Sequence, residues 1–347
     1  MGTLAQRGQK RDKMRRGLAA GLLTALAAAM PGLARGQERP QLSLPLDCVP
    51  NKTCFIQNFV DIDPSPGVRD FSCGSASYDK HTGTDFRLLS VEAAKAGVAV
   101  KAAADGVVKA VRDGVADALI RETKGEDIKG RECGNGVLIE HGGGWETQYC
   151  HLKQGSLKVS AGDKVERGAT LGEVGYSGMA DFAHVHLTVR HSGKIIDPFL
   201  PDSVNGACAR DKSSAGMWVP HEIARFPYRA GIIAHSGFAG ALPDKDVLEK
   251  NHAEVEPITP TAAAIVFYGR MLNLSAGDRI RITINGPGGT LVEHLSEPLE
   301  RSRALHLASL GKKRRDGRWM AGRYSGQIEI VREGAVTAAA VSEFTMP

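Results

Sequence analysis

Polar and apolar residues alternate along the segment 184–190, and this pattern restricts its backbone to one kind of structure. The polar residues are His184, His186, Thr188 and Arg190, and the apolar residues are Val185, Leu187 and Val189. A period of two residues is typical of a half-buried β-strand. Both imidazoles therefore leave the same face, roughly 7 Å apart at the backbone. At this separation one ring can bind a metal ion while the other acts on a water molecule bound to that ion.

Short segments of the same kind, separated by turns that contain glycine, fill the middle of the chain. The expected strands cover residues 98–102, 106–112, 136–141, 145–152, 170–174 and 184–190. The turns include Ala104-Asp105-Gly106, Gly142-Gly143-Gly144 and Ala161-Gly162-Asp163. Strands with these turn signals predict an antiparallel β-sheet, which we expect to end at Asp197-Pro198.

A second set of alternating segments follows in the last quarter of the chain. These segments cover residues 262–274, 278–285, 291–294, 321–331 and 335–344. They predict an immunoglobulin-like β-sandwich of about 90 residues, so the whole chain belongs to the mainly β class. This part holds no cluster of metal-binding side chains, and we interpret it as a positioning or binding module.

A second candidate cluster is the segment from His81 to Asp85. These two residues would share a face at helical i,i+4 spacing, but Thr82, Gly83 and Thr84 between them are poor helix formers. We therefore expect a loop or an extended segment that bends at Gly83. A straight strand would hold positions 81 and 85 roughly 13 Å apart, too far for both to bind one ion. Metal binding requires the bend.

A third candidate, His151, follows Cys150, and this neighbour raises the possibility of a Cys–His nucleophile. Strand alternation argues against that pair, because it puts the two side chains on opposite faces. One face is expected to carry Trp145, Thr147, Tyr149 and His151, and the other Gln148, Cys150 and Leu152. A structural zinc site of Cys and His is excluded as well, because the chain has no Cys-x2-Cys pair.

These clusters together resemble a known family. Six of the eleven histidines lie between His81 and His191, and two His with one carboxylate are a catalytic zinc pattern. Residues 70–200 resemble the lysostaphin/LytM-type zinc endopeptidases of bacterial cell walls, with every motif in the order found in that family. The motifs are His81-x-Gly83-x-Asp85, Gly134-Asn135-Gly136-Val137 to His141-Gly142, Tyr149-x-His151-Leu152, Gly175-Tyr176-Ser177-Gly178 and His184-x-His186.

The resemblance implies a role for each residue. His81, Asp85 and His186 would bind one zinc ion per chain, and His151 and His184 would be the catalytic pair. Two imidazoles that do not bind the metal suit proton transfer near neutral pH. The sequence leaves open which of the two is the base. Tyr78 is a candidate donor to the oxyanion, and packing against its neighbours is the alternative role for it.

The N-terminus has the layout of a signal peptide. Arg15-Arg16 precedes an apolar stretch, Leu18–Met30, and Ala34-Arg35-Gly36 offers small residues for cleavage after Gly36. A retained N-terminal anchor is the alternative, but the apolar stretch is short and rich in alanine for a membrane span. We expect no stable membrane span after cleavage.

Removal of residues 1–36 also removes the basic character of the chain. That segment holds seven of the 44 Lys and Arg but only one of the 39 Asp and Glu, which leaves 37 basic and 38 acidic residues. The net charge therefore changes from +5 to −1 and offers no argument for binding to nucleic acid. We interpret the basic run Lys312–Arg315 as a solvated turn.

Six cysteines in an exported chain favour disulfides over free thiols. Six residues allow fifteen pairings. Cys133 with Cys150 is plausible across the hairpin at residues 142–144, and Cys48 with Cys54 can close a small loop. Cys73 with Cys208 then follows by elimination.

These observations predict a periplasmic or secreted zinc metalloendopeptidase that resembles cell-wall hydrolases and cuts peptide stems or cross-links of peptidoglycan. The expected division of the chain is a signal peptide (1–36), an N-terminal extension (37–70), the peptidase domain (71–202), a linker with one short helix (203–257) and the immunoglobulin-like domain (258–347). The chain without residues 1–36 is long enough to form two hydrophobic cores.

The sequence offers two alternative functions. Residues 101–108 and 158–165 resemble hairpins of lipoyl or biotinyl carriers, but no Met-Lys-Met or similar tripeptide is present. A non-enzymatic regulator of other wall hydrolases, built on the same fold, is the stronger alternative. Against it, all five candidate zinc and catalytic positions carry the residue type that activity requires.

Overall fold

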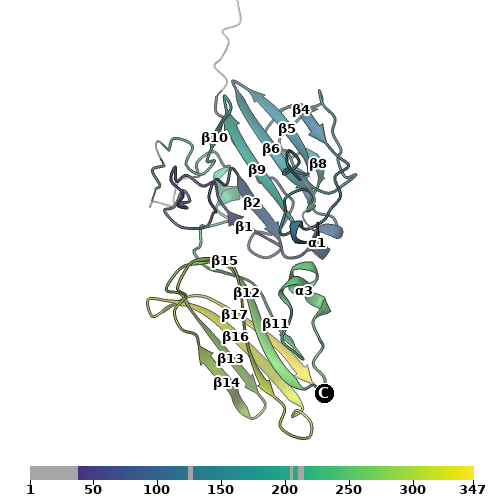
Figure 1. The fold of residues 1–347 in the computed structure, drawn as a ribbon, viewed down its shortest axis with the longest axis vertical. Helices are drawn as coiled ribbons and strands as arrows, with labels where there is room; N and C mark the ends of the chain where they lie inside the picture. The colour runs from purple at the N-terminus through teal and green to yellow at the C-terminus, as the bar shows by residue number, and fades with distance from the viewer. Residues whose placement is uncertain (1–37, 124–127, 204–205, 210–214) are drawn as a thin grey trace, which may run out of the picture. The chain divides into compact units, whose positions relative to one another are not determined.

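The computed structural model describes residues 38–123, 128–203, 206–209 and 215–347 (Figure 1). Gln37–Pro347 forms one compact unit. The described residues are mainly β, and the strands within each sheet pair antiparallel, as the alternation predicted. The expected signal peptide and its cleavage site lie outside the described residues. None of the described helices has the length and apolar character needed to cross a membrane.

The larger sheet has eight strands in the order β1-β2-β9-β6-β5-β4-β7, with β10 paired to β9. All six strands expected in this part of the chain are present, each within one or two residues of its expected bounds: four lie in this sheet, and the other two, β3 and β8, pair as a separate ribbon. The sheet strands are β1 (Cys54–Asn58), β2 (Thr84–Leu88), β4 (Gly106–Arg112), β5 (Asn135–Gly142), β6 (Trp145–Leu152), β7 (Lys164–Val165), β9 (His184–His191) and β10 (Lys194–Ile196). The ribbon is β3 (Ala99–Lys101) with β8 (Thr170–Glu173), and the short helices nearby are α1 (Val91–Lys95), η1 (Ile120–Glu122) and α2 (Pro220–Ile223).

One face of the three central strands packs into the core. Phe86 of β2, Tyr149 of β6, and Val185 and Leu187 of β9 are completely buried there. Because successive side chains of a strand point to opposite faces, the residues between them are directed to the other face. The polar positions of β9 therefore lie opposite the core, as the sequence predicted.

The hairpin between β5 and β6 turns through three glycines. Gly142, Gly143 and Gly144 all have positive φ angles, of 78°, 57° and 81°. Glycine adopts this left-handed region without the steric cost that a side chain adds. The turn brings the two arms together, so that Cys133, just before β5, reaches Cys150 of β6 and forms a disulfide.

The structure holds the three disulfides considered from the sequence, and no cysteine is free among its described residues. The bonds are Cys48–Cys54, Cys73–Cys208 and Cys133–Cys150. The second joins residues 135 positions apart. Such a bond stabilises the folded chain chiefly by restricting the unfolded one.

The C-terminal part forms two further antiparallel sheets, β11-β12-β15 and β14-β13-β16-β17. Side chains of both sheets, such as Phe267 and Ile282, meet in a shared hydrophobic core. The strands are β11 (Ile232–Ala239), β12 (Ala264–Leu274), β13 (Arg279–Gly286), β14 (Gly289–Leu295), β15 (Arg303–Lys313), β16 (Gly322–Arg332) and β17 (Ala335–Met346). The immunoglobulin-like assignment and the domain boundaries stay predictions.

Two segments of this part differ from expectation. The predicted linker, residues 203–257, contains strand β11 and helix α2 besides the expected short helix α3 (Lys245–Lys250) and the turn η2 (His252–Glu254). Lys312 and Lys313 lie in β15 and not in a solvated turn, because β15 pairs with β12 up to the pair of Ala264 with Lys313. The partner strand, which is distant in sequence, sets this conformation.

We expect the buried carboxyl of Asp197 to make the stability of the protein depend on pH. Its carboxyl is buried, and one oxygen has no hydrogen-bond partner. Burial raises the pKa of Asp197 to about 7. Between about pH 4 and pH 7 the unfolded carboxyl is ionised and the folded one is protonated, so stability falls as pH rises, by at most about 1.4 kcal/mol per pH unit. The Asp197→Asn variant has no carboxyl to titrate at this position, so its free energy of unfolding should fall less between pH 4 and pH 7. Urea unfolding at a series of pH values, with EDTA present, measures this difference.

The matched control is Asp202→Asn, because Asp202 is exposed and pairs with Arg39. This change should leave the fall in stability between pH 4 and pH 7 in place. Identical slopes for Asp197→Asn and the unaltered protein would contradict a protonated Asp197 carboxyl.

Candidate metal and catalytic site

Three side chains bring their donor atoms together on the face of the sheet opposite the core. His186 Nδ1 lies 2.8 Å from Asp85 Oδ1 and 3.1 Å from His81 Nε2, and His81 Nε2 lies 3.2 Å from Asp85 Oδ1. A tetrahedral zinc ion with bonds of about 2.0 to 2.1 Å would separate its ligand atoms by about 3.3 Å. The donor set of two imidazoles and one carboxylate, and its spacing, therefore fit zinc.

The strand register explains why these residues meet. Asp85 of β2 is directly paired with His186 of β9. As expected, the chain bends at Gly83, between His81 and the start of β2, and the imidazole of His81 lies beside Asp85. A side chain at Gly83 would place its Cβ only 2.5 Å from His186 Nε2 and 2.6 Å from the Leu187 carbonyl oxygen. Glycine is therefore required here because the loop passes so close to β9.

Each candidate ligand is held by a further partner on its outer side. His81 Nδ1 donates to the Phe59 carbonyl at 2.6 Å, which leaves the lone pair of Nε2 for a metal in the neutral ring. The side-chain amide of Asn58 donates from Nδ2 to Asp85 Oδ2 at 2.8 Å. The Thr188 hydroxyl lies 3.0 Å from His186 Nε2. Sequence reasoning missed these partners, and only Thr188 carried a signal, since it follows His186 on the same strand face.

The charges in this group favour an ionised Asp85. Burial opposes ionisation, but the imidazoles of His81, His184 and His186 outweigh it and hold the pKa of the Asp85 carboxyl well below its usual value. Burial likewise opposes the charge of His81, but the carboxylate of Asp85 more than compensates and raises the pKa of that ring. A buried carboxylate that is already ionised can bind a cation without losing a proton.

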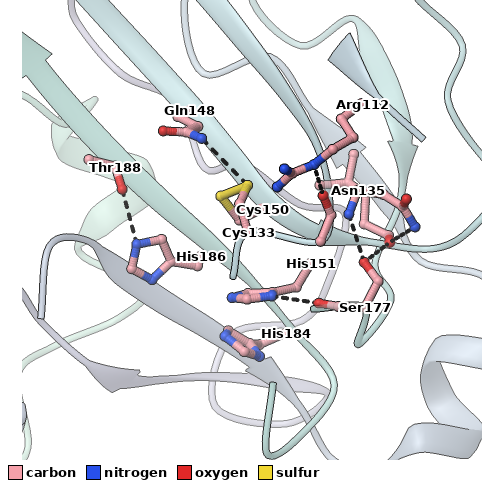
Figure 2. Close-up of a disulfide and its surroundings, with 12 residues drawn as sticks. Arg112, Cys133, Asn135, Gln148, Cys150, His151, Ser177, His184, His186 and Thr188 are labelled. Atoms are coloured by element: carbon pink, nitrogen blue, oxygen red, sulfur yellow. Dashed lines mark hydrogen bonds between the residues drawn. A yellow bond between two sulfur atoms is a disulfide. The ribbon is translucent and has the colours of Figure 1, made fainter. Parts of the chain in front are cut away.

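His151 and His184 lie beside this group with their rings 4.5 Å apart (Figure 2). His151 Nδ1 donates to the Ser177 carbonyl and His184 Nδ1 to the Phe182 carbonyl, each at 2.8 Å. His184 Nε2 is 3.6 Å from Asp85 Oδ1. Burial lowers the pKa of both histidines, more strongly for His151. In the neutral rings the remaining nitrogen, Nε2, is a proton acceptor.

The expected alternation along β6 is wrong at its end. His151 lines the same groove as Gln148 and Cys150, although strict alternation would put it on the other face. The reason is its backbone, which has a left-handed φ of 64° and so leaves the regular strand geometry. Cys150 does not act as a nucleophile, because its sulfur is bonded to Cys133.

A groove of about 440 Å³ is lined by His81, His151 and His186 of the site, but not by Asp85 or His184. Its wall is mixed in charge and includes the Cys133–Cys150 disulfide and Arg190. Tyr78 lies at its rim, half exposed, with its ring 4.4 Å from the His81 ring. Tyr78 therefore both packs on a candidate ligand and borders the groove. The arrangement can admit a peptide segment to a metal site flanked by two neutral imidazoles.

Residues 79–198 match the model of Peptidase family M23, so this part of the chain is a peptidase family M23 domain. The chain is 33% identical over 120 residues to the DD-carboxypeptidase/endopeptidase Mpg of Neisseria meningitidis serogroup B, covering 34% of this chain and 22% of that protein. It is 34% identical over 68 residues to the cell division protein DipM of Caulobacter vibrioides, covering 20% and 11%. The chain thus spans about a fifth or less of the length of these curated relatives.

Solved structures with a similar arrangement include two catalytic domains. The catalytic domain of lysostaphin from Staphylococcus simulans is 19% identical, with a TM-score of 0.27, and the match covers 43% of this chain and 90% of that domain. A point mutant of the catalytic domain of the prophage-encoded M23 protein EnpA from Enterococcus faecalis is 24% identical, with a TM-score of 0.28, and the match covers 42% and 90%.

Proposed function

We propose that this protein is a zinc metalloendopeptidase that hydrolyses peptide bonds in peptidoglycan stems or cross-links. The observation that carries the proposal is the joint geometry of the site. Three donor atoms within 3.2 Å of one another lie next to two imidazoles whose Nδ1 atoms are fixed by backbone carbonyls. The match to Peptidase family M23 supports peptide hydrolysis as the reaction class, and the resemblance to relatives supports peptidoglycan as the substrate.

In this proposal His81, Asp85 and His186 hold the zinc ion. When bound, zinc supplies a Lewis acid that polarises a carbonyl oxygen and makes water more acidic. His151 and His184 begin with a lone pair on Nε2, so either can take a proton from the attacking water. The ring that has gained the proton then becomes a donor at Nε2 and can return it to the leaving nitrogen. The other imidazole orients the reacting groups.

We also propose that the protein acts in the periplasm or outside the cell. The signal-peptide layout of residues 1–36 supports export. The pairing of all six cysteines supports an oxidising compartment, since disulfides persist there and are rare in the cytosol.

The direct test uses purified protein without residues 1–36, loaded with zinc. We expect it to cleave cross-linked muropeptides, and the products identified by chromatography and mass spectrometry should name the scissile bond. Oligoglycine is the second substrate, since it separates a glycyl endopeptidase from one that cuts stem peptides. EDTA should abolish cleavage and added zinc should restore it.

The non-enzymatic alternative makes the opposite prediction. If the zinc-loaded protein cleaves neither substrate but still sediments with peptidoglycan, the regulator function is correct and the hydrolase proposal is wrong. The same assay with His184→Ala shows whether any cleavage comes from this site or from a contaminating enzyme.

A further inference from the structure

A buried group of charged side chains joins strand β2 of the M23 domain to helix α3, which follows that domain in sequence. Arg87 Nη2 donates to both carboxylate oxygens of Glu249, at 2.6 Å each. The two side chains are only 1% and 6% exposed. Gln57 of β1 accepts a further hydrogen bond from Arg87 Nη1. The ion pair is therefore removed from water, and its geometry is fixed on both sides.

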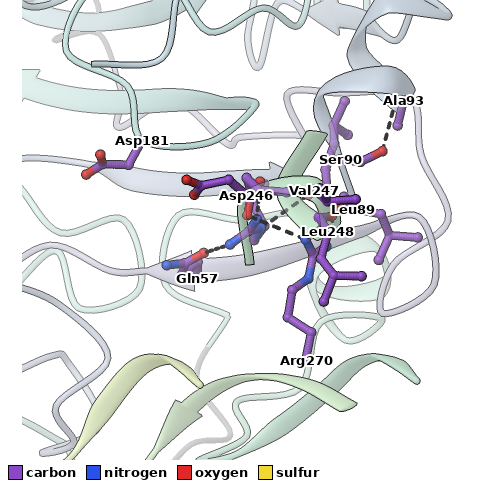
Figure 3. Close-up of polar contacts among 12 residues, drawn as sticks. Gln57, Leu89, Ser90, Ala93, Asp181, Asp246, Val247, Leu248 and Arg270 are labelled. Carbon is purple, nitrogen blue, oxygen red and sulfur yellow. Dashed lines mark hydrogen bonds and ion pairs between the residues drawn. The ribbon is translucent and has the colours of Figure 1, made fainter. Parts of the chain in front are cut away.

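Arg270 of β12 completes the group. It donates to the Leu248 carbonyl at 2.8 Å and to the Leu89 carbonyl (Figure 3). Its Nη1 is 3.4 Å from Glu249 Oε2. Glu249 is thus a single carboxylate between two buried guanidinium groups. Removal of its charge would leave two buried cations facing each other, and the side chain of Arg87 would have to move.

Arg87 is also connected to the candidate site. It lies two residues after Asp85 and is paired in register with His184. Its guanidinium carbon lies 4.4 Å from the centre of the Phe182 ring. The Phe182 ring is in turn 4.4 Å from the His184 ring, and the Phe182 carbonyl accepts the hydrogen bond from His184 Nδ1. Glu249 is therefore connected to His184 through two intermediate residues, Arg87 and Phe182.

We propose that Glu249 is a positioning residue for His184, acting through Arg87 and Phe182. The segment after the M23 domain then contributes to catalysis without touching substrate. This inference rests on the proposed function for its kinetic consequence. With Glu249 in place, the guanidinium holds the Phe182 ring, and the Phe182 carbonyl fixes the direction of the His184 ring. Without it, Arg87 leaves Phe182, and the orientation of His184 is no longer unique.

The test compares Glu249→Gln with Lys250→Gln. Lys250 is the next residue of α3, and its ion pair with Glu122 is half exposed, so its loss serves as the matched control. For Glu249→Gln we expect kcat to fall about 10- to 100-fold, the cost of misplacing a catalytic group by about 1 Å. KM and zinc content should stay within about twofold of the unaltered protein, and Lys250→Gln should match it in kcat.

Three further readouts separate positioning from a general loss of structure. Glu249→Asp, which keeps the charge, should recover part of kcat. Phe182→Leu should lower kcat without disturbing the ion pair, and combined with Glu249→Gln it should add little, since both act on His184. The His184 Nδ1–H signal in ¹⁵N NMR should exchange faster with water in Glu249→Gln than in Lys250→Gln.

The positioning role of Glu249 can be tested whether or not the protein hydrolyses peptidoglycan peptides. An unchanged kcat in folded, zinc-loaded Glu249→Gln, or fully additive losses with Phe182→Leu, would overturn it. If Glu249→Gln does not fold, Phe182→Leu with normal kcat has the same meaning. If the unaltered protein hydrolyses nothing, the proposed function has failed, and the exchange of the His184 proton still tests the positioning role by itself.

Discussion

Replacement of His151 or His184 by alanine should leave zinc bound and lower kcat by about 10²- to 10⁴-fold, the usual loss when a positioned acid or base is removed. Both rings lie beside the donor group, but neither belongs to the set of three atoms within 3.2 Å. Both act on one transition state, so the double variant should lose far less than the product of the single losses. Steady-state kinetics on a cleavable muropeptide, with zinc measured by mass spectrometry, check this.

His191→Ala is the control for this experiment. His191 is the last residue of β9, and its ring stacks on Trp145 at 4.3 Å, outside the donor group. Near-normal kcat is expected for it. A normal kcat in His151→Ala or His184→Ala would show that the histidine in question is structural.

Alanine at any of the three candidate ligands should remove both zinc and activity. A catalytic zinc site keeps its fourth position for the substrate or water, so two protein ligands are too few to hold the ion. The loss of one ligand also removes contacts that orient the other two. The effect should be largest for Asp85→Ala, because that carboxylate is the only negative charge among the three and contacts both imidazoles. Zinc content after dialysis against a weak chelator is the measurement.

Two outer partners extend this prediction. Asn58→Ala and Thr188→Val should each weaken zinc binding by about 10- to 100-fold, since they remove a hydrogen bond that orients a ligand. Full zinc occupancy in His186→Ala would instead mean that His186 is not a ligand, and the assignment of the three donors would be wrong.

The strands of the M23 domain were largely predictable because their signal is local. Alternation over 184–190 places His184 and His186 on one face, and strand β9 has that form. What could not be predicted depends on partners distant in sequence. Strand β1 was not expected, and it supplies Asn58 opposite Asp85. Neither residue carries any sign of this pairing.

Two further features that the sequence did not reveal also have physical causes. His151 leaves the alternation because of a left-handed φ, and periodicity carries no information on a single backbone angle. Glu249 lies in a segment whose composition suggested a linker, and its role depends on two arginines that are 162 and 21 residues away. A buried glutamate can be recognised only when the structure supplies its partners.

The Cys73–Cys208 disulfide has a consequence for the durability of the site. All five candidate ligand and catalytic residues lie between these two cysteines. A protease that cuts any one peptide bond in this interval cannot release a fragment, since the two pieces stay covalently joined. Nicked material should therefore run as one species on a gel without reductant and as two with it, and the broken chain can keep its five residues on one scaffold.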